Sequence, residues 1–163
     1  MEYSRTQIAI SAGAGVLLLV IFLGYLLYLN GHGPVLSRSE ERDPLSGVPN
    51  AISLNPLRDR ASEHAAAKYL KVMRDGNCQT QLADMEKDYR RKYAGFICES
   101  EARHPLISWT LVDWEDQPPL RVLQYRGKRY TDQTRKSTYE ELFSATLEKK
   151  DGGWVVTKYD AMY

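Results

Sequence analysis

Charged residues are absent from a long stretch near the N-terminus. Between Gln7 and Ser37 the chain has no Asp, Glu, Lys or Arg, although these residues make up 26% of the whole sequence. Within this stretch, residues 8–29 are almost entirely apolar. A helix of that length spans roughly 33 Å, about the thickness of the hydrocarbon core of a bilayer. The missing charge therefore predicts a transmembrane helix.

A cleaved signal peptide is the alternative interpretation of this segment. Signal peptides have a basic start, an apolar core of about 7–15 residues and a cleavage site flanked by small residues. Here the apolar core is longer, residues 1–7 are barely basic, and no good cleavage site follows Leu29. We therefore expect a short N-terminal tail, residues 1–7, followed by an uncleaved anchor, residues 8–29.

Small residues recur at a spacing of four within the apolar segment. Such spacing lets the backbone of one helix approach another helix closely in lipid. Small residues also occur in single anchors that contact lipid alone. We expect a helix-packing face made of four residues: Ala9, Ser11, Gly13 and Gly15.

The rest of the chain lacks the features of several functional classes. Residues 61–163 contain 17 basic and 16 acidic residues, so no strong field of one sign is available to attract nucleic acid. The histidines and cysteines lack the spacing of metal ligands, and no serine lies in a nucleophile-elbow motif. The only Gly-rich run that could suggest a phosphate loop lies inside the apolar segment. We therefore expect no cofactor, no metal and no nucleic-acid partner.

Cysteine is also scarce, with only Cys78 and Cys98 in the chain. An even number of cysteines beyond the apolar segment suits a disulfide in an oxidising compartment, and two buried thiols are the alternative.

The basic residues flanking the apolar segment are nearly balanced, so they barely define its orientation. The short N-terminal tail, the cysteine pair, and Tyr25 and Tyr28 near the distal end favour a cytoplasmic N-terminus. We expect a bacterial inner-membrane protein with an extracytoplasmic C-terminal domain.

Residues 30–60 contain four prolines and three glycines without sustained periodicity, which predicts a linker. Beyond it, apolar residues at helical spacing predict a helix that begins near residues 59–62 and stops at residues 75–77. A second helix is expected from Cys78 to about residues 93–95.

The residues after Pro105 have the composition of strands. Segments rich in β-branched, aromatic or alternating apolar residues predict four strands: 106–114, 120–125, 137–149 and 154–159. Residues 126–128 are expected to form a turn, and residues 151–153 to reverse the chain between the last two strands. Two helices followed by antiparallel strands predict an α+β domain over residues 61–163, with the helices packed on a curved sheet.

Two segments resemble the nuclear transport factor 2-like superfamily, also called the cystatin-like cone fold. Residues 65–76 (AAAKYLKVMRDG) are similar to the family's first helix, and residues 147–156 (LEKKDGGWVV) to its closing hairpin. The resemblance covers roughly residues 60–163 and implies that the last strand is central in the sheet. The family usually has a third short helix before the strands, for which residues 99–103 are a poor candidate.

The family resemblance also implies a cone-shaped cavity. In enzymes of this fold, an Asp or His in the cavity moves a proton with the help of tyrosines. No candidate here falls in a motif of those enzymes, so we expect core, strand-end or loop roles and no catalysis. The candidate pocket residues are His104, Trp109, Asp113, Tyr125, Tyr139 and Trp154.

The combined features predict a non-catalytic accessory or assembly subunit of a larger membrane protein complex, whose partners are the membrane and the other subunits. This architecture is similar to that of bitopic assembly subunits of bacterial type IV secretion systems. The alternative is a membrane-tethered domain that binds a small ligand or acts as an enzyme. A closed apolar pocket with His104 or Asp113 pointing inward would favour that alternative, whereas a cavity filled by aromatic side chains would favour a scaffold.

The orientation can be tested with a membrane-impermeant thiol reagent applied to intact cells. Because an extracytoplasmic disulfide protects both sulfurs, we expect labelling of Cys78 and Cys98 only after reduction with an impermeant phosphine. Mass spectrometry of the purified chain measures the labelling. Labelling that also requires permeabilised cells would contradict the expected orientation.

Overall fold

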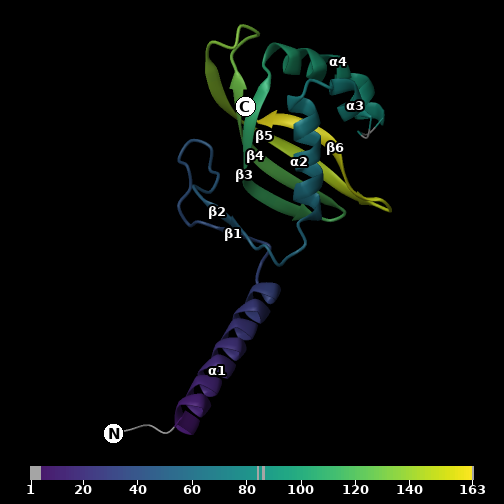
Figure 1. Cartoon of the computed structure of the whole chain (residues 1–163). Helices are drawn as coiled ribbons and strands as arrows, with labels where there is room; N and C mark the ends of the chain where they lie inside the picture. Colours follow the sequence, from purple (N-terminus) through teal and green to yellow (C-terminus); the bar gives the residue numbers. More distant parts are fainter. Residues whose placement is uncertain (1–4, 84, 86, 163) are drawn as a thin grey trace. The chain divides into compact units, whose positions relative to one another are not determined.

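Figure 1 shows the computed structural model of the chain, which is described for residues 5–162 except 84 and 86. The chain divides into two compact units. The first contains the N-terminal residues up to Val35 together with residues 54–59, and the second contains residues 36–53 and the chain from Arg60 onward.

The first unit is built on α1, Arg5–His32, a helix of 28 residues. Over Gly15–His32 this helix is long and apolar enough to cross a membrane. Its C-terminal carbonyls, which have no partner within a helix, accept hydrogen bonds from nearby side chains. The amide of Asn55 donates to the Asn30 carbonyl, and Arg58 donates to the Gly31 carbonyl at 2.7 Å.

The expected helix-packing face falls mostly on side chains that the structure does not describe. Ala9, Ser11 and Gly13 lie outside the described side chains. At Gly15 the space that a Cβ atom would occupy is open, with no described heavy atom within 4 Å. The proposed packing face therefore stays a prediction.

The second unit confirms the α+β fold class. Within the described residues, four antiparallel strands form one sheet in the order β3-β4-β5-β6, so each strand pairs with its neighbours along the chain. Figure 1 shows α2 lying across one face of this curved sheet, with α3 and α4 near one end. The elements are α2 Ala61–Arg74, α3 Cys78–Leu82, α4 Lys87–Arg103, β3 Leu106–Gln117, β4 Leu120–Tyr130, β5 Thr138–Lys150 and β6 Gly153–Met162.

Three details differ from the sequence-based expectations. The second predicted helix is divided into α3 and α4, and α4 continues to Arg103, so residues 99–103 are helical after all. Residues 126–128 lie within β4 and not in a turn. The last strand, β6, lies at the edge of the sheet and not at its centre.

The core lies between α2 and the sheet. Ala66, Leu70 and Met73 fall on one face of α2 and are buried, as their helical spacing predicts. Opposite them, the Phe143 ring stacks on Tyr125, with centroids 5.4 Å apart, and contacts Tyr159 at 5.2 Å. Aromatic rings thus fill the concave side of the sheet.

The segment before α2 contributes a short two-stranded sheet made of β1, Leu36–Arg38, and β2, Ile52–Leu54. Arg38 fastens β1 to β3 because its Nε donates to the Asp113 carboxylate at 2.5 Å and its Nη2 donates to the Trp114 carbonyl. Most of this hairpin, residues 36–53, belongs to the second unit, although the sequence predicts it as part of a linker.

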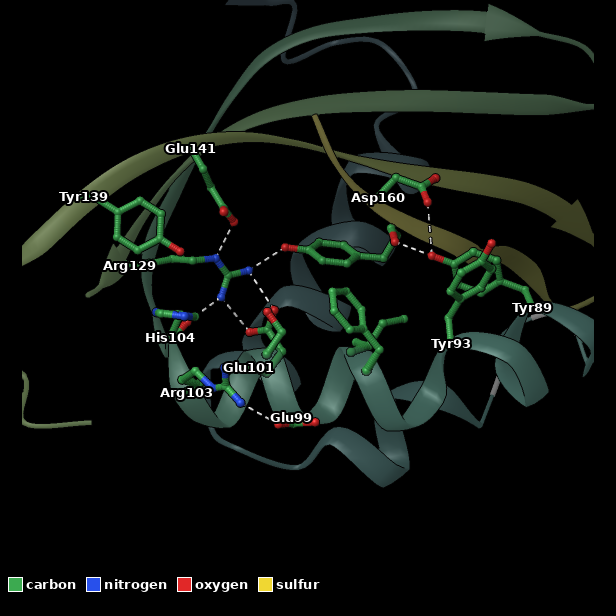
Figure 2. Close-up of a pocket in the computed structure, with 14 residues that line it drawn as sticks. Tyr89, Tyr93, Glu99, Glu101, Arg103, His104, Arg129, Tyr139, Glu141 and Asp160 are labelled. Carbon is green, nitrogen blue, oxygen red and sulfur yellow. Dashed lines mark hydrogen bonds and ion pairs between the residues drawn. The ribbon is translucent and has the colours of Figure 1, made fainter. Parts of the chain in front are cut away.

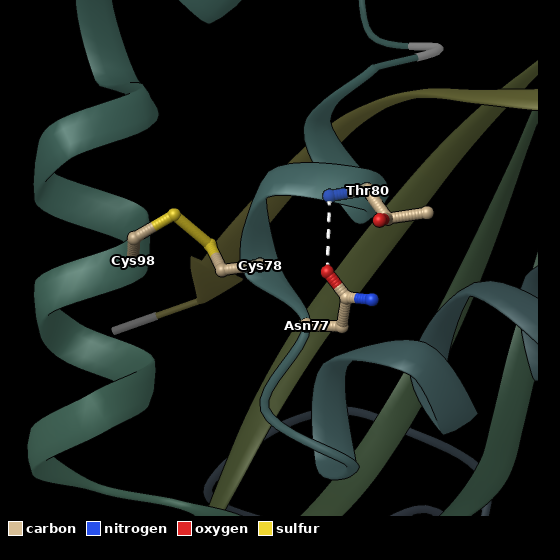
Figure 3. Close-up of a disulfide and its surroundings, with 4 residues drawn as sticks. All are labelled: Asn77, Cys78, Thr80 and Cys98. Carbon is tan, nitrogen blue, oxygen red and sulfur yellow. Dashed lines mark hydrogen bonds between the residues drawn. A yellow bond between two sulfur atoms is a disulfide. The ribbon is translucent and has the colours of Figure 1, made fainter.

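A disulfide joins α3 to α4 (Figure 3). Cys78 begins α3 and Cys98 lies in α4; their Cα atoms are 5.5 Å apart, and the two residues are 20 positions apart in the sequence. The side chain of Asn77 caps α3 by accepting a hydrogen bond from the Thr80 amide at 3.4 Å. Closing a chain loop of this length stabilises a fold by about 3 kcal/mol. The disulfide matters here because Ile97 is the one residue of α4 that is buried among the described side chains.

The hairpin between β5 and β6 closes the other end of the sheet. Gly153 has a φ of 116°, a conformation that side chains rarely permit, which explains a glycine at this reversal. Trp154 then lies against the guanidinium of Arg121, 4.9 Å from its ring centroid, and Trp114 lies on the same guanidinium at 4.5 Å. These cation–π contacts fix the closing hairpin to β3 and β4.

Replacing Gly127 in β4 tests the packing of the core. A Cβ atom at this position would lie 2.5 Å from Cε1 of the fully buried Phe143. We expect Gly127→Ala to lower the free energy of unfolding by about 1–3 kcal/mol, because the ring has to shift within a packed core. Urea unfolding of the detergent-solubilised protein, followed by near-UV circular dichroism, measures the change.

Gly152→Ala in the β5–β6 turn is the matched control, since no heavy atom lies within 4 Å of its added Cβ. We expect this variant to change stability by less than about 1 kcal/mol. Equal stability of the two variants would contradict the described contact between Gly127 and Phe143.

Candidate functional site

A pocket of about 690 Å³ lies between α4 and the end of the sheet (Figure 2). Five aromatic residues line it, and they come from both sides: Tyr89, Tyr93, Phe96, Tyr139 and Tyr159. Seven ionisable residues also line it, and Ile97 and Ser100 complete the lining. The ionisable residues are Glu99, Glu101, Arg103, His104, Arg129, Glu141 and Asp160. The pocket is therefore aromatic and charged at the same time.

Arg129 forms the polar floor of the pocket and is only 3% exposed. Its Nε donates to the Glu141 carboxylate. Its Nη1 donates to Glu101 at 2.7 Å and to the His104 carbonyl at 2.8 Å. Its Nη2 donates to Glu101 at 2.8 Å and to the Tyr159 hydroxyl at 2.5 Å. A guanidinium has five N–H donors, and all five are used.

The Arg129 network ties four elements together. Glu101 and His104 belong to the end of α4 and the loop that follows it, while Arg129, Glu141 and Tyr159 belong to β4, β5 and β6. Figure 2 shows the guanidinium between these side chains. A buried, bidentate pair of this kind holds its partners in one geometry. The network therefore fixes the C-terminal end of α4 against the sheet.

The surroundings of the Glu101 carboxyl group shift its pKa. Burial raises its pKa, and the hydrogen bonds from Arg129 offset part of that increase. Both of its oxygens accept hydrogen bonds from Arg129. A general base needs a free oxygen that can reach a substrate proton, so Glu101 is engaged in structure and is poorly placed for proton transfer.

The other end of the pocket is held by Tyr89 of α4. Its hydroxyl donates to the Tyr159 carbonyl and lies 3.2 Å from the Asp160 carboxylate. Burial and the nearby Asp160 charge raise the pKa of Tyr89 far above its ordinary value, so the hydroxyl stays protonated. Tyr89 and Arg129 thus clamp α4 onto the sheet at its two ends.

The six candidate pocket residues from the sequence are divided among four places. His104 and Tyr139 line the pocket, with their rings edge-to-face at 6.0 Å. Tyr125 is buried in the aromatic core, and Trp154 packs on Arg121 at the closing hairpin. The remaining two lie elsewhere on β3: Trp109 beside Arg74 at 5.8 Å, and Asp113 in its ion pair with Arg38.

The sequence-based reasoning missed Arg129 and its glutamates. One signal was available. Side chains alternate between the two faces of a strand, so in an uninterrupted β4 the side chain of Arg129 lies on the same, concave face as that of Tyr125. The expected turn at residues 126–128 hid this signal. No comparable signal exists for the pairing of Arg129 with Glu101, because the two residues are 28 positions apart.

No metal site is evident in the part of the chain that the structure describes, where no three His, Cys, Asp or Glu side chains cluster suitably. His104 has one polar atom without a partner among the described residues, its buried Nδ1. The pocket therefore offers aromatic faces, carboxylates and the unpartnered Nδ1 of His104.

No protein-family model matches the chain, and no curated protein matches its sequence. Among solved structures, a SEC-C motif containing protein from Rhodopseudomonas palustris superposes with a TM-score of 0.51 at 8% identity, over 66% of this chain and 84% of that chain. An NTF2-like designed protein has a TM-score of 0.48 at 18% identity, over 61% of this chain and 99% of that chain.

A putative calcium/calmodulin dependent protein kinase II association domain from Xanthomonas campestris has a TM-score of 0.49 at 15% identity, over 65% of this chain and 89% of that chain. At such low identities, the likeness to the Rhodopseudomonas protein shows the fold alone.

Removing the Arg129 guanidinium tests its structural role. We expect Arg129→Met to lower the free energy of unfolding by about 3–5 kcal/mol, because Glu101 and Glu141 lose their buried cation. Urea unfolding of the solubilised protein measures the loss. Arg103→Gln, which removes an exposed pair with Glu99, is the control and should cost less than about 1 kcal/mol. Similar costs for both variants would contradict the role assigned to Arg129.

Proposed function

We propose that this chain is a membrane-anchored, non-catalytic accessory or assembly subunit of a larger membrane protein complex. Its pocket between α4 and the sheet binds a partner protein. One observation carries the proposal: the polar floor of the pocket is saturated by internal hydrogen bonds, whereas its rim displays aromatic side chains to solvent.

The saturated floor argues against catalysis. All N–H groups of Arg129 donate hydrogen bonds to Glu101, Glu141 and neighbouring oxygens. None is left to stabilise a negatively charged transition state. Both oxygens of Glu101 accept hydrogen bonds from Arg129, so a substrate proton would have to compete with this ion pair for them. The concave side behind them is filled by packed aromatic rings, the condition that favours a scaffold.

The exposed rim argues for contact with a protein. Phe96 is 67% exposed on α4, and Tyr93 and Tyr139 are 36% and 37% exposed around the same pocket. Large aromatic side chains gathered at the surface are typical of protein-binding hot spots, because they bury much area at little entropic cost. The rim therefore supplies the contact surface of the proposed subunit.

The membrane anchor and the compartment are parts of the same proposal. The apolar length of α1 supports an anchor, with the expected face of Ala9, Ser11, Gly13 and Gly15 available to pack on a partner helix. The Cys78–Cys98 disulfide supports an oxidising compartment for the domain. We therefore assign the domain to the extracytoplasmic side of a bacterial inner membrane.

The test uses the full-length protein extracted from native membranes in a mild maltoside detergent. We expect the wild-type chain to migrate in a complex larger than its own detergent micelle on native gels. Phe96→Ser should reduce the share found in that complex at least tenfold, because losing a central aromatic anchor costs about 2 kcal/mol or more of binding free energy. Phe96 is exposed, so the variant should remain folded by circular dichroism.

Leu45→Ser is the matched control, since Leu45 is another apolar side chain of this domain and is 98% exposed away from the pocket lining. A complex that survives Phe96→Ser but not Leu45→Ser would refute binding through the pocket. A lone wild-type chain that releases a small molecule on denaturation would refute the subunit role. That result would favour a tethered ligand-binding domain, to which the size of the pocket is also suited.

A further inference from the structure

The pocket carries an excess of negative charge. The described residues that line it include four carboxylates but only two guanidinium groups. At neutral pH, with His104 uncharged, this difference leaves two negative charges without a cation. The excess is unexpected in a chain whose formal net charge is +1.

The excess charge can be located within the pocket. Glu99 and Arg103 form an exposed ion pair at 2.5 Å and cancel each other. Arg129 is shared between Glu101 and Glu141, so the floor keeps one negative charge. Asp160 carries the other and forms no ion pair within the described part of the chain; its carboxylate lies 3.2 Å from the Tyr89 hydroxyl, which donates to the Tyr159 carbonyl. Among the described carboxylates of the pocket, Asp160 is therefore the one without a cation of its own.

Aromatic faces stand beside this carboxylate. Tyr89 and Tyr93 contact each other with ring centroids 4.8 Å apart, and Phe96 follows on the same helix. Figure 2 shows Tyr89 and Tyr93 at the same end of the pocket as Asp160. Aromatic faces attract cations through their quadrupole, and a nearby carboxylate strengthens that attraction. Lys92 of the same helix already holds its Nζ 5.0 Å from the centre of the Tyr93 ring.

Building on the proposed function, we propose that the partner presents a basic segment, and that a lysine or arginine side chain of this segment binds between Asp160 and the α4 aromatics. The methylene stem of such a side chain suits the apolar surface of Phe96, while its charged head suits Asp160. A volume of about 690 Å³ accommodates several side chains, which fits a peptide segment better than a lone small cation. Anionic ligands are disfavoured because the donors of Arg129 are all used.

The test measures binding of a defined probe to the full-length protein in maltoside micelles, whose headgroup is uncharged. The probe is a fluorescein-labelled hexapeptide of alternating lysine and leucine, and the comparison probe replaces lysine with glutamate. We expect fluorescence anisotropy to show binding of the basic probe only. Raising the salt concentration should weaken this binding, because the attraction is electrostatic.

Three variants separate charge from structure. Asp160→Asn keeps an oxygen near the Tyr89 hydroxyl and should weaken binding of the basic probe about twofold to fivefold. Arg103→Gln removes a positive charge from the same pocket and should strengthen binding of the basic probe by a similar factor. Glu115→Gln, an exposed carboxylate of β3 outside the pocket lining, is the control and should leave binding unchanged. A merely structural effect of these variants would not reverse sign between Asp160 and Arg103.

Several results would overturn the inference. Equal binding of the acidic probe, or an effect of Glu115→Gln as large as that of Asp160→Asn, would show that the pocket does not select a basic segment. Binding of phosphocholine vesicles without binding of the basic peptide would assign the site to a lipid headgroup instead.

The two proposals can fail separately. A native complex lost on Phe96→Ser, together with no binding of the basic probe, would leave the subunit role intact and refute the basic segment. Probe binding with the expected reversal of sign, in membranes that contain only the lone chain, would support recognition of basic segments and refute the subunit role.

Discussion

The buried guanidinium of Arg129 is the constraint on which the pocket side of the domain depends. The helix α4 buries little apolar surface, so hydrophobic packing alone does not position it. Arg129 holds its C-terminal end through Glu101, and Tyr89 holds its other end through the Tyr159 carbonyl. The disulfide to Cys78 fixes the middle. Without these three attachments the aromatic wall of the pocket would have no fixed place beside the sheet.

Much of the fold follows from local sequence patterns. The helical spacing of Ala66, Leu70 and Met73 predicts α2 and its buried face, and the residues after Lys149 predict the closing hairpin. The path of β4 could not be read in the same way, because Gly127 between two basic residues is typical of a turn. Its actual role is to leave room for the Phe143 ring, a contact between different strands. Local patterns carry no information about such contacts.

The candidate site was harder to predict than the fold. His104 and Tyr139, two of the six candidate residues, line the pocket, but Arg129, Glu141 and Asp160 reach it from three different strands. The helix α4, which supplies much of the remaining lining, buries a single apolar residue among its described side chains. Helices held by ion pairs and a disulfide leave a weaker trace in the sequence than helices held by a hydrophobic face. The pocket is consequently a product of long-range polar contacts, and its saturated floor and aromatic rim are the features on which we base the proposed binding role.

The position of the disulfide has a consequence for how the domain is assembled. Both cysteines precede β3, and the loop they close contains no strand of the sheet. Oxidation can therefore proceed while the strand-forming half of the polypeptide is still being synthesised. Because the chain has two cysteines, a single intramolecular pairing exists, and no reshuffling of mispaired bridges within one molecule is needed. The disulfide can restrict α3 and α4 to a hairpin against which the strands β3 to β6 then pack.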